Sequence, residues 1–168
     1  MARYNEEVVK YIPHLRRYSR ALMCNDVIAA DDLVQDCLER ALSRIHLWRE
    51  GSDLRAWLFT IMHNLFVNHI RKQSRTPEFV DVELTPVIDN RLPEDKLVVR
   101  DLQLAISRLP PDQREVLLLV SIEGLRYQDV AGILGVPEGT VMSKLSRARQ
   151  KVRNEMQIIK PGRLRRVK

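Results

Sequence analysis

The residues best placed to do chemistry lie near the C-terminal end of the chain, and their types favour DNA binding over catalysis. Thr140, Lys144, Arg147 and Lys151 recur at intervals of four, three and four residues, so they share one face of a helix. Such side chains can meet base edges and phosphates when a helix enters the major groove. The alternative is a helical hairpin whose basic face is only solvated.

The segment before this helix predicts a helix-turn-helix. Residues 127–134 form a short amphipathic pattern, Gly135 interrupts it, and Pro137 can open the next helix. Ala131 is small where two helices cross closely, Gly135 suits a left-handed turn, and Val141 can seal the core. A helix-turn-helix alone leaves repressors, activators and recombinases open.

Charge along the chain points to the same kind of partner. The formal net charge is only +6, but beyond Thr140 the basic residues are opposed by Glu155 alone. A basic surface of this kind favours a nucleic acid, because each cation near a phosphate releases counterions; a solvated basic tail is the alternative. The basic residues are Lys144, Arg147, Arg149, Lys151, Arg153, Lys160, Arg163, Arg165, Arg166 and Lys168.

Catalytic and metal chemistry find no support in the sequence. No nucleophile and base, glycine-rich phosphate loop or carboxylate pair stands at usable spacing. Cys24 and Cys37 are too far apart for a Cys-x-x-Cys motif, so apolar packing is expected for both. We therefore expect no enzyme, no cofactor, no metal and no small-molecule substrate. The histidines, none at zinc spacing, are His14, His46, His63 and His69.

Composition indicates a globular chain. The 45% hydrophobic and 30% charged content fits neither a disordered nor a membrane protein, and no apolar run approaches the roughly 20 residues of a bilayer span. Charged residues interrupt the first 20 positions, which excludes a secretory signal there. A cytoplasmic location is expected.

A helix-breaking, acidic stretch divides the chain. Thr76, Pro77, Pro86 and Pro93 interrupt helical spacing, and only the short piece 79–84 has any alternating character. The sequence therefore predicts an all-α protein with two small domains, 1–75 and 95–160, a flexible linker over 76–94 and a basic tail over 161–168. The acidic residues of the linker are Glu78, Asp81, Glu83 and Asp89.

Three helices are expected in the first domain. One spans about 5–23, a second starts near Asp31 and Asp32, and Asp53 can cap a third. The second helix has one apolar stripe: Leu33, Val34, Cys37, Leu38, Ala41, Leu42 and Ile45. The third points Leu54, Trp57, Leu58, Ile61 and Leu65 inward.

The second domain is expected to open with a helix that Pro110 and Pro111 terminate. Another helix then runs over about 112–123 and stops at Gly124. The inward side of the opening helix is Leu97, Leu102, Ala105, Ile106 and Leu109.

Motifs in both domains resemble the sigma-70 family. The run LPPDQREVLLLVSIEGLRYQDVAGILGVPEGTVMSKLSRARQKVR is similar to region 4, DDLVQDCLERAL to region 2.2, and SDLRAWLFTIMHNLFVNHIRK to regions 2.3 and 2.4. Because only these two domains fit the chain, it is similar to the extracytoplasmic-function (ECF) group. The resemblance implies promoter-specific initiation with core RNA polymerase, whose largest-subunit clamp and flap would be contacted, and an anti-sigma factor, often membrane-anchored in this group.

The resemblance also implies site residues. Docking on the polymerase clamp would fall to Asp32, Gln35, Asp36 and Glu39. The minus-10 element would be opened and bound by Trp48, Arg49, Ser52, Arg55, His63, Asn64, Asn68 and Arg71, with Trp48 stacking on a base and Trp57 left in the core. The minus-35 element would be bound by Glu138, Thr140, Ser143, Lys144 and Arg147.

Two departures from the family pattern affect base reading. Met142 stands where many members have a basic residue, and Lys144 stands where arginine is common, although lysine lacks the two-pronged contact of arginine with guanine. Two other functions stay open: a one-component helix-turn-helix regulator, and a sigma-like decoy that sequesters an anti-sigma factor.

Overall fold

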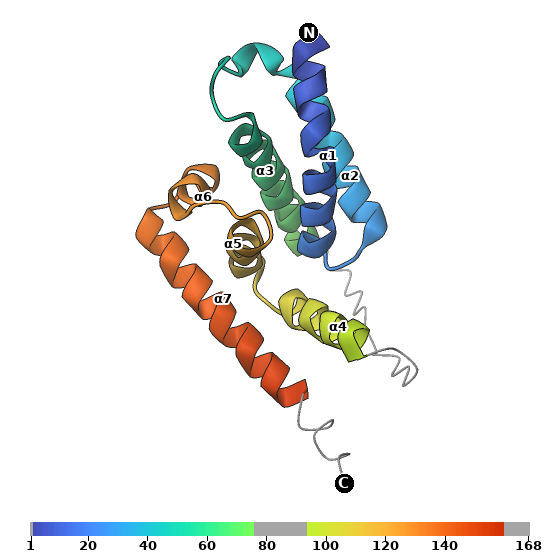
Figure 1. Cartoon of the computed structure of the whole chain (residues 1–168), viewed down its shortest axis with the longest axis vertical. Helices are drawn as coiled ribbons and strands as arrows, with labels where there is room; N and C mark the ends of the chain where they lie inside the picture. The colour runs from blue at the N-terminus through green and yellow to red at the C-terminus, as the bar shows by residue number, and fades with distance from the viewer. Residues whose placement is uncertain (1, 76–93, 160–168) are drawn as a thin grey trace.

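The computed structural model describes residues 2–75 and 94–159, and every regular element in these stretches is a helix, which confirms the all-α prediction. Residues 76–93 of the predicted linker, with the piece 79–84, and the predicted tail 161–168 lie outside the described residues. The elements are α1 (Ala2–Leu22), α2 (Val27–Ser43), the 3₁₀ helix η1 (Ile45–Leu47), α3 (Leu54–Arg75), α4 (Glu94–Ser107), α5 (Pro111–Ser121), α6 (Tyr127–Leu134) and α7 (Glu138–Ile159) (Figure 1).

The first three helices pack around one apolar core. Tyr18 of α1 meets Phe59 of α3 edge to face, with ring centroids 5.1 Å apart and planes at 88°, an arrangement that the ring quadrupoles favour. Cys37 of α2 is fully buried, and its Sγ lies 3.5 Å from the carbonyl oxygen of Leu58. Burial raises the pKa of this thiol to about 12, so Cys37 has the packing role that the sequence predicted.

The start of α2 differs from the prediction. Asp26 accepts a hydrogen bond from the backbone N–H of Ala29 at 3.0 Å, so the helix begins at Val27. Asp31 and Asp32 lie inside the helix, about one turn later than its true start. The predicted start was wrong because two adjacent acids suit a helix N-terminus electrostatically, whereas Asp26 satisfies the orphan N–H group directly.

The helix-turn-helix forms as predicted. Gly135 ends α6 in the left-handed region, at φ 64° and ψ 36°, and its N–H donates to the carbonyl oxygen of Ala131. This conformation costs glycine little and other residues more, so the turn needs glycine here. Val141 at the start of α7 is fully buried, as expected of the residue that seals the core between the helices.

Two predicted core residues are exposed instead. Leu42 is 49% exposed and Leu102 is 40% exposed. Leu102 lines an open groove between α1 and α4 together with Ile106 and three arginines of α1: Arg16, Arg17 and Arg20. Helical spacing alone predicted a single inward stripe, but among the described helices α4 packs mainly against α1 and α7 and leaves part of its apolar side uncovered.

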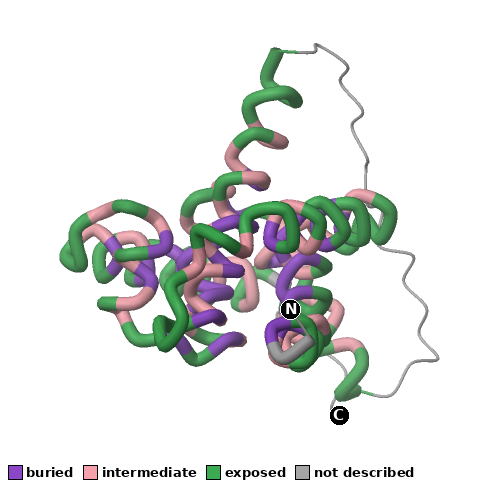
Figure 2. The backbone as a smooth tube through the Cα atoms, turned by 90° about the horizontal axis from the view of Figure 1, so that it is seen from above, coloured by how far each residue is buried: buried purple, intermediate pink, exposed green. Residues whose placement is uncertain are grey.

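The two helical bundles touch one another. α4 and α5 pack against α1, and α6 packs against α3 (Figure 1). Seen from above, the buried parts of the helices lie along their inner sides and the exposed parts lie outside (Figure 2). This contact contains predicted site residues, Arg55 and His63 among them.

Candidate nucleic-acid interface

The predicted minus-35 residues lie along the first turns of α7. Glu138, Ser143 and Arg147 are exposed, and Thr140 is partly covered. Lys144 is the least available, because its Nζ lies 3.2 Å from Oδ2 of an aspartate in α5, Asp112. Most of this face is therefore open to a DNA groove, while Lys144 is held by an ion pair within its own domain.

The predicted polymerase-docking residues form an open acidic face on α2. Asp32, Gln35, Asp36 and Glu39 are all exposed, on the side opposite the buried residues Leu33, Val34 and Cys37. The Nε2 of Gln35 donates to Oε1 of Glu39 at 3.0 Å. The helix thus presents acidic groups to a partner while its apolar side holds the core.

The predicted minus-10 residues fall into two groups. Five of them are exposed and three are partly buried. Asp53 caps α3 through the N–H of Ala56 at 3.1 Å, as predicted, and α3 carries most of the set. The exposed residues are Arg49, Ser52, Asn64, Asn68 and Arg71; the partly buried ones are Trp48, Arg55 and His63.

Trp48 packs inward in this structure. Its ring lies 5.7 Å from that of Tyr4, and the indole Nε1 is buried without a hydrogen-bond partner in the described residues. Trp57 also approaches Tyr4, at 6.5 Å, and packs against the core as predicted. Stacking of Trp48 on a DNA base stays a prediction, and it requires the ring to leave Tyr4.

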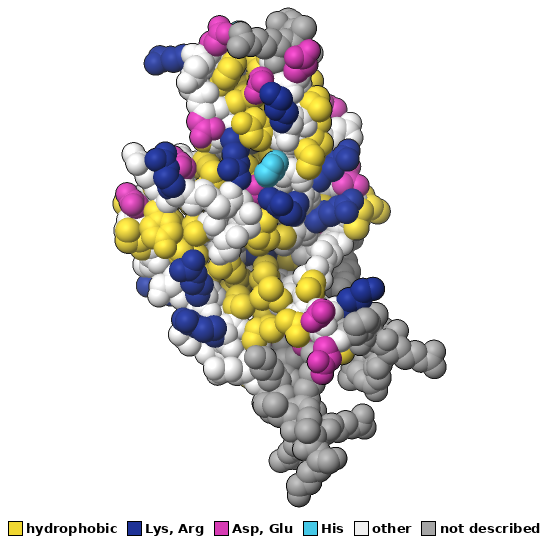
Figure 3. All heavy atoms as spheres, viewed as in Figure 1, with side chains coloured by type: hydrophobic (Ala, Val, Ile, Leu, Met, Phe, Trp, Pro, Cys, Tyr) yellow, Lys and Arg dark blue, Asp and Glu magenta, His cyan; other side chains and the backbone are white. Residues whose placement is uncertain are grey.

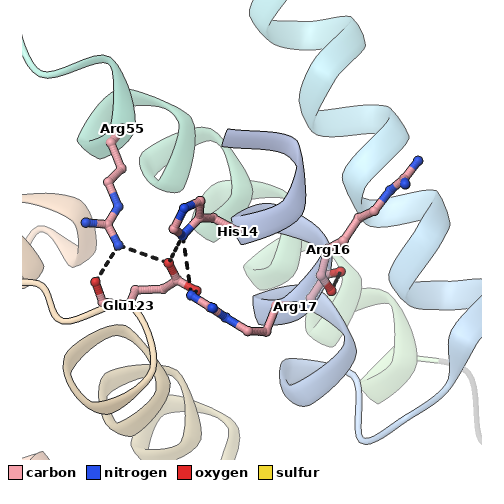
Figure 4. A network of polar contacts seen from close by, with 6 residues as sticks. His14, Arg16, Arg17, Arg55 and Glu123 are labelled. Carbon is pink, nitrogen blue, oxygen red and sulfur yellow. Dashed lines mark hydrogen bonds and ion pairs between the residues drawn. The ribbon is translucent and has the colours of Figure 1, made fainter. Parts of the chain in front are cut away.

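Arg55 points into the second domain and meets a buried carboxylate. Its guanidinium lies 3.0 Å from Oε2 of Glu123 and also donates to the carbonyl oxygen of that residue. From α1, Arg17 reaches Oε1 of Glu123 at 3.0 Å, and Nδ1 of His14 lies 3.0 Å from Oε2 (Figure 4). The Glu123 side chain is fully buried, so three side chains of the first domain enclose one carboxylate of the second.

His63 has a second buried carboxylate as its partner. Its Nδ1 lies 2.6 Å from Oε1 of Glu115 in α5. Burial raises the pKa of Glu115, and the hydrogen bond and charge of His63 partly offset this rise. Burial also raises the pKa of Tyr18, and the negative charges of Glu115 and Glu123 add to that effect.

Arg114, the residue before Glu115, fixes the same contact through backbone groups. Its Nη1 donates to the carbonyl oxygen of Leu22, at the end of α1, at 2.9 Å. The other guanidinium nitrogens donate to carbonyl oxygens of Ile106 and Ser107 at the end of α4 and of Leu109 in the turn after it. One buried arginine therefore ties the second domain to the first through backbone carbonyl oxygens.

Sequence reasoning missed the acceptors of these contacts. Glu115 and Glu123 lie in or beside the apolar run of α5, and both are buried. Acidic residues inside such a run are a usable signal, because a buried carboxylate needs a partner. Their partners were not predictable, since Arg55 and Glu123 are 68 positions apart in the chain.

Comparisons with known proteins show the family of this chain. A family model described as region 4 of sigma-70 matches residues 100–152, and one described as the sigma2 domain of PhyR matches residues 8–63. The ECF RNA polymerase sigma factor EcfG of Rhodopseudomonas palustris is 38% identical over 148 residues, which cover 88% of this chain and 81% of that protein. The chain belongs to the ECF RNA polymerase sigma factors.

Other ECF sigma factors and a solved structure extend the likeness. The sigma factor SigE of Mycolicibacterium smegmatis is 34% identical over 133 residues, which cover 74% of this chain and 51% of that longer protein. The sigma factor RpoE in complex with the anti-sigma factor NepR, from Bartonella quintana, aligns with a TM-score of 0.77 and 32% identity, over 94% of this sigma factor and 99% of that chain.

Membership of the ECF sigma factors confirms that the protein is not an enzyme. Within residues 2–75 and 94–159, no helix is both long and apolar enough to cross a membrane. Across the same residues, no three histidine, cysteine or acidic side chains are grouped so that they could hold a metal ion.

Proposed function

We propose that this ECF sigma factor binds core RNA polymerase, recognises minus-35 and minus-10 promoter elements and helps to separate the two DNA strands. The observation that carries the proposal is the face of α7 with Glu138, Ser143 and Arg147, which follows a helix-turn-helix and is open to solvent. A helix presented in this way can enter the major groove. Because promoters and polymerase are its partners, the protein acts in the cytoplasm.

Polymerase docking is assigned to the acidic face of α2. Asp32, Asp36 and Glu39 place carboxylates on one exposed side, where they can pair with basic groups of the polymerase clamp. The second domain would contact the flap at the same time. Two separate contacts of this kind hold both domains on one polymerase, so that their DNA-binding faces can act on one promoter.

The minus-10 element is assigned to the first domain. Arg49, Asn64 and Arg71 are among the exposed candidates, and they can neutralise phosphates and bind unstacked bases. Arg55 and His63 face Glu123 and Glu115 in this arrangement. They can bind DNA only after the two domains separate.

An anti-sigma factor is the proposed regulator. The similar sigma factor from Bartonella quintana was solved in complex with the anti-sigma factor NepR, and it aligns over nearly the whole of this chain. A partner that holds the two domains together would keep Arg55 and His63 from DNA. Control by such a partner needs no change in either domain fold.

The test is in vitro transcription with purified protein, core RNA polymerase and fragmented genomic DNA, with the new 5′ ends mapped. Discrete start sites that share two upstream motifs at fixed spacing are expected. DNA binding without new start sites would instead indicate a one-component regulator.

A second candidate function is a sigma-like decoy for an anti-sigma factor. It is favoured by one observation, the match of residues 8–63 to the sigma2 domain of PhyR. A decoy needs no DNA-binding face, whereas α7 keeps Arg147 exposed on the predicted recognition side. Capture of an anti-sigma factor without DNA binding or transcription would establish the decoy.

A further inference from the structure

Three side chains of the first domain converge on one point. His14 and Arg17 come from α1 and Arg55 comes from α3, and each has a nitrogen 3.0 Å from a carboxylate oxygen of Glu123. Figure 4 shows all three turned toward that carboxylate, whereas Arg16, the next residue along α1, points away. Two helices therefore build a single anion-binding position.

The charges of this position are not balanced. The guanidinium groups of Arg17 and Arg55 face a single carboxylate charge, and His14 adds a further nitrogen that can donate. A fully buried carboxylate is costly without partners, so Glu123 depends on this cluster. The cluster depends on Glu123 in return, because its departure leaves two like charges side by side on the first domain.

Arg55 links this position to DNA. It is one of the predicted minus-10 residues, but in this arrangement its Nη2 is used by the carboxylate and carbonyl oxygens of Glu123. A guanidinium binds carboxylate and phosphate oxygens with the same geometry, so the two anions are interchangeable ligands. The place that Glu123 leaves is therefore suited to a phosphate.

We propose that His14, Arg17 and Arg55 form a phosphate site for promoter DNA, and that Glu123 occupies this site as an internal substitute when the two domains are in contact. This assignment rests on the proposed function, and it adds two α1 residues to the DNA-binding set of the first domain. Glu123 and a DNA phosphate then compete for one site, so domain contact opposes DNA binding even without a partner protein.

The surroundings of the site fit this exchange. The Arg17 side chain is 54% exposed although it touches the buried carboxylate, so the site lies at the edge of the domain contact. On the face of the molecule that Figure 3 shows, Lys and Arg side chains gather around a histidine. A DNA strand can approach this edge from solvent and meet positive charge before the domains have parted.

The experiment measures DNA affinity and molecular size with the full-length protein. The probe is fluorescein-labelled single-stranded DNA of random sequence, followed by fluorescence anisotropy across a salt series. Glu123→Gln is expected to raise the radius of gyration in small-angle X-ray scattering and to tighten DNA binding about tenfold, which equals roughly 1.4 kcal/mol. Circular dichroism establishes that the variant is folded.

A second substitution distinguishes a site that binds DNA phosphate from a contact that only holds the two domains together. In the Glu123→Gln background, Arg17→Gln is expected to cancel most of the gain and to reduce the slope of log affinity against log salt by about 0.7, the effect of losing one phosphate contact to a single strand. Arg16→Gln, a neighbouring arginine that points away, is the matched control and should change neither by as much. Equal effects of the two arginine variants would overturn the proposal.

Two further outcomes bear on the assignment. Unchanged DNA affinity in a folded, expanded Glu123→Gln variant would overturn it, because the freed cations would then not bind phosphate. In the otherwise native chain, Arg17→Gln should loosen the domain contact without tightening DNA binding; tighter binding would overturn it as well. None of these assays contains polymerase, so a failed transcription test would overturn the proposed function alone.

Discussion

Two helices of this sigma factor carry residues predicted to bind DNA, and the structure treats them differently. On α7, Glu138, Ser143 and Arg147 are exposed. Lys144 forms an ion pair, but its partner, Asp112, belongs to the same domain. On α3, Arg55 and His63 are turned onto carboxylates of the other domain.

The difference means that the two predicted DNA-binding faces do not become available to DNA at the same time. The α7 face is predicted to meet a minus-35 element while the domains remain in contact, because Glu138, Ser143 and Arg147 are exposed in this arrangement. Lys144 differs from them, since it lines a pocket that it shares with residues of α3. The α3 face loses two of its residues to that contact and regains them only on opening. The proposed assignments therefore predict minus-35 binding before, and minus-10 binding after, separation of the domains.

The largest expected effect tests whether the α7 face is the open recognition surface. Arg147→Ala should reduce promoter-specific transcription about 5- to 150-fold, the equivalent of the roughly 1–3 kcal/mol that one base contact supplies. Arg149→Ala, an exposed arginine outside the predicted minus-35 set, is the matched control. In vitro transcription on a mapped promoter measures both, and equal losses would contradict the assignment of the recognition face.

Polymerase docking provides the next test, because it uses α2 and should not depend on whether the α3 face or the α7 face is exposed. Charge reversal of Asp32 and Asp36 to lysine is expected to weaken core polymerase binding about tenfold, because two favourable charge contacts become repulsive. Fluorescence anisotropy with labelled sigma factor gives the affinity. Glu6→Lys, an exposed acid on α1, is the control; the docking assignment fails if both variants bind like the native protein.

A smaller effect is expected from destabilising α3, the helix whose Arg55 and His63 face carboxylates of the other domain. Asp53→Ala removes the N-cap of α3 and should lower the free energy of unfolding by about 1 kcal/mol. Asp53→Asn retains a cap oxygen and should lose much less. Urea unfolding followed by circular dichroism measures the difference, and identical losses in the two variants would show that the cap hydrogen bond is not the cause.

The smallest expected effect is a change in how stability depends on pH, caused by Glu115, the partner of His63 on α3. Burial raises the pKa of Glu115 above its ordinary 4.5, so its contribution to stability is complete below that value and is lost as the pH rises through the raised pKa. Glu115→Gln cannot ionise, so its stability relative to the native protein should increase as the pH rises through this range.

Urea unfolding at a series of pH values gives the difference for Glu115→Gln. The Arg147→Ala variant, which changes only the open face, provides the comparison and should show no such trend. A stability difference between Glu115→Gln and the native protein that does not vary with pH would contradict the raised pKa.

The fold was predictable where local chemistry decides it. Residues 127–134 form α6 at the predicted bounds, because an amphipathic turn followed by Gly135 has few other solutions. The Asp53 cap was predictable for the same reason. The start of α2 was not, since Asp26, Asp31 and Asp32 all suit a helix N-terminus and only the hydrogen bond of Asp26 selects among them.

The candidate site was predictable only in part, because its state depends on contacts between distant positions. Periodicity places Arg55 on a polar part of α3, but nothing within α3 indicates that Glu123 of the other domain will reach it. Leu102 illustrates the same limit, because its exposure depends on how far α4 covers α1. Pairing between domains is a property of packing, which spacing along one helix does not encode.

The packing of Trp48 beside Tyr4 gives the protein a built-in optical probe. The chain has two tryptophans, Trp48 and Trp57, and both lie in the first helical bundle within reach of the same tyrosine ring. Tryptophan emission therefore follows the melting of that bundle alone, whereas far-ultraviolet dichroism follows all helices. Superimposable melting curves from the two signals would mean that both halves unfold as one cooperative unit.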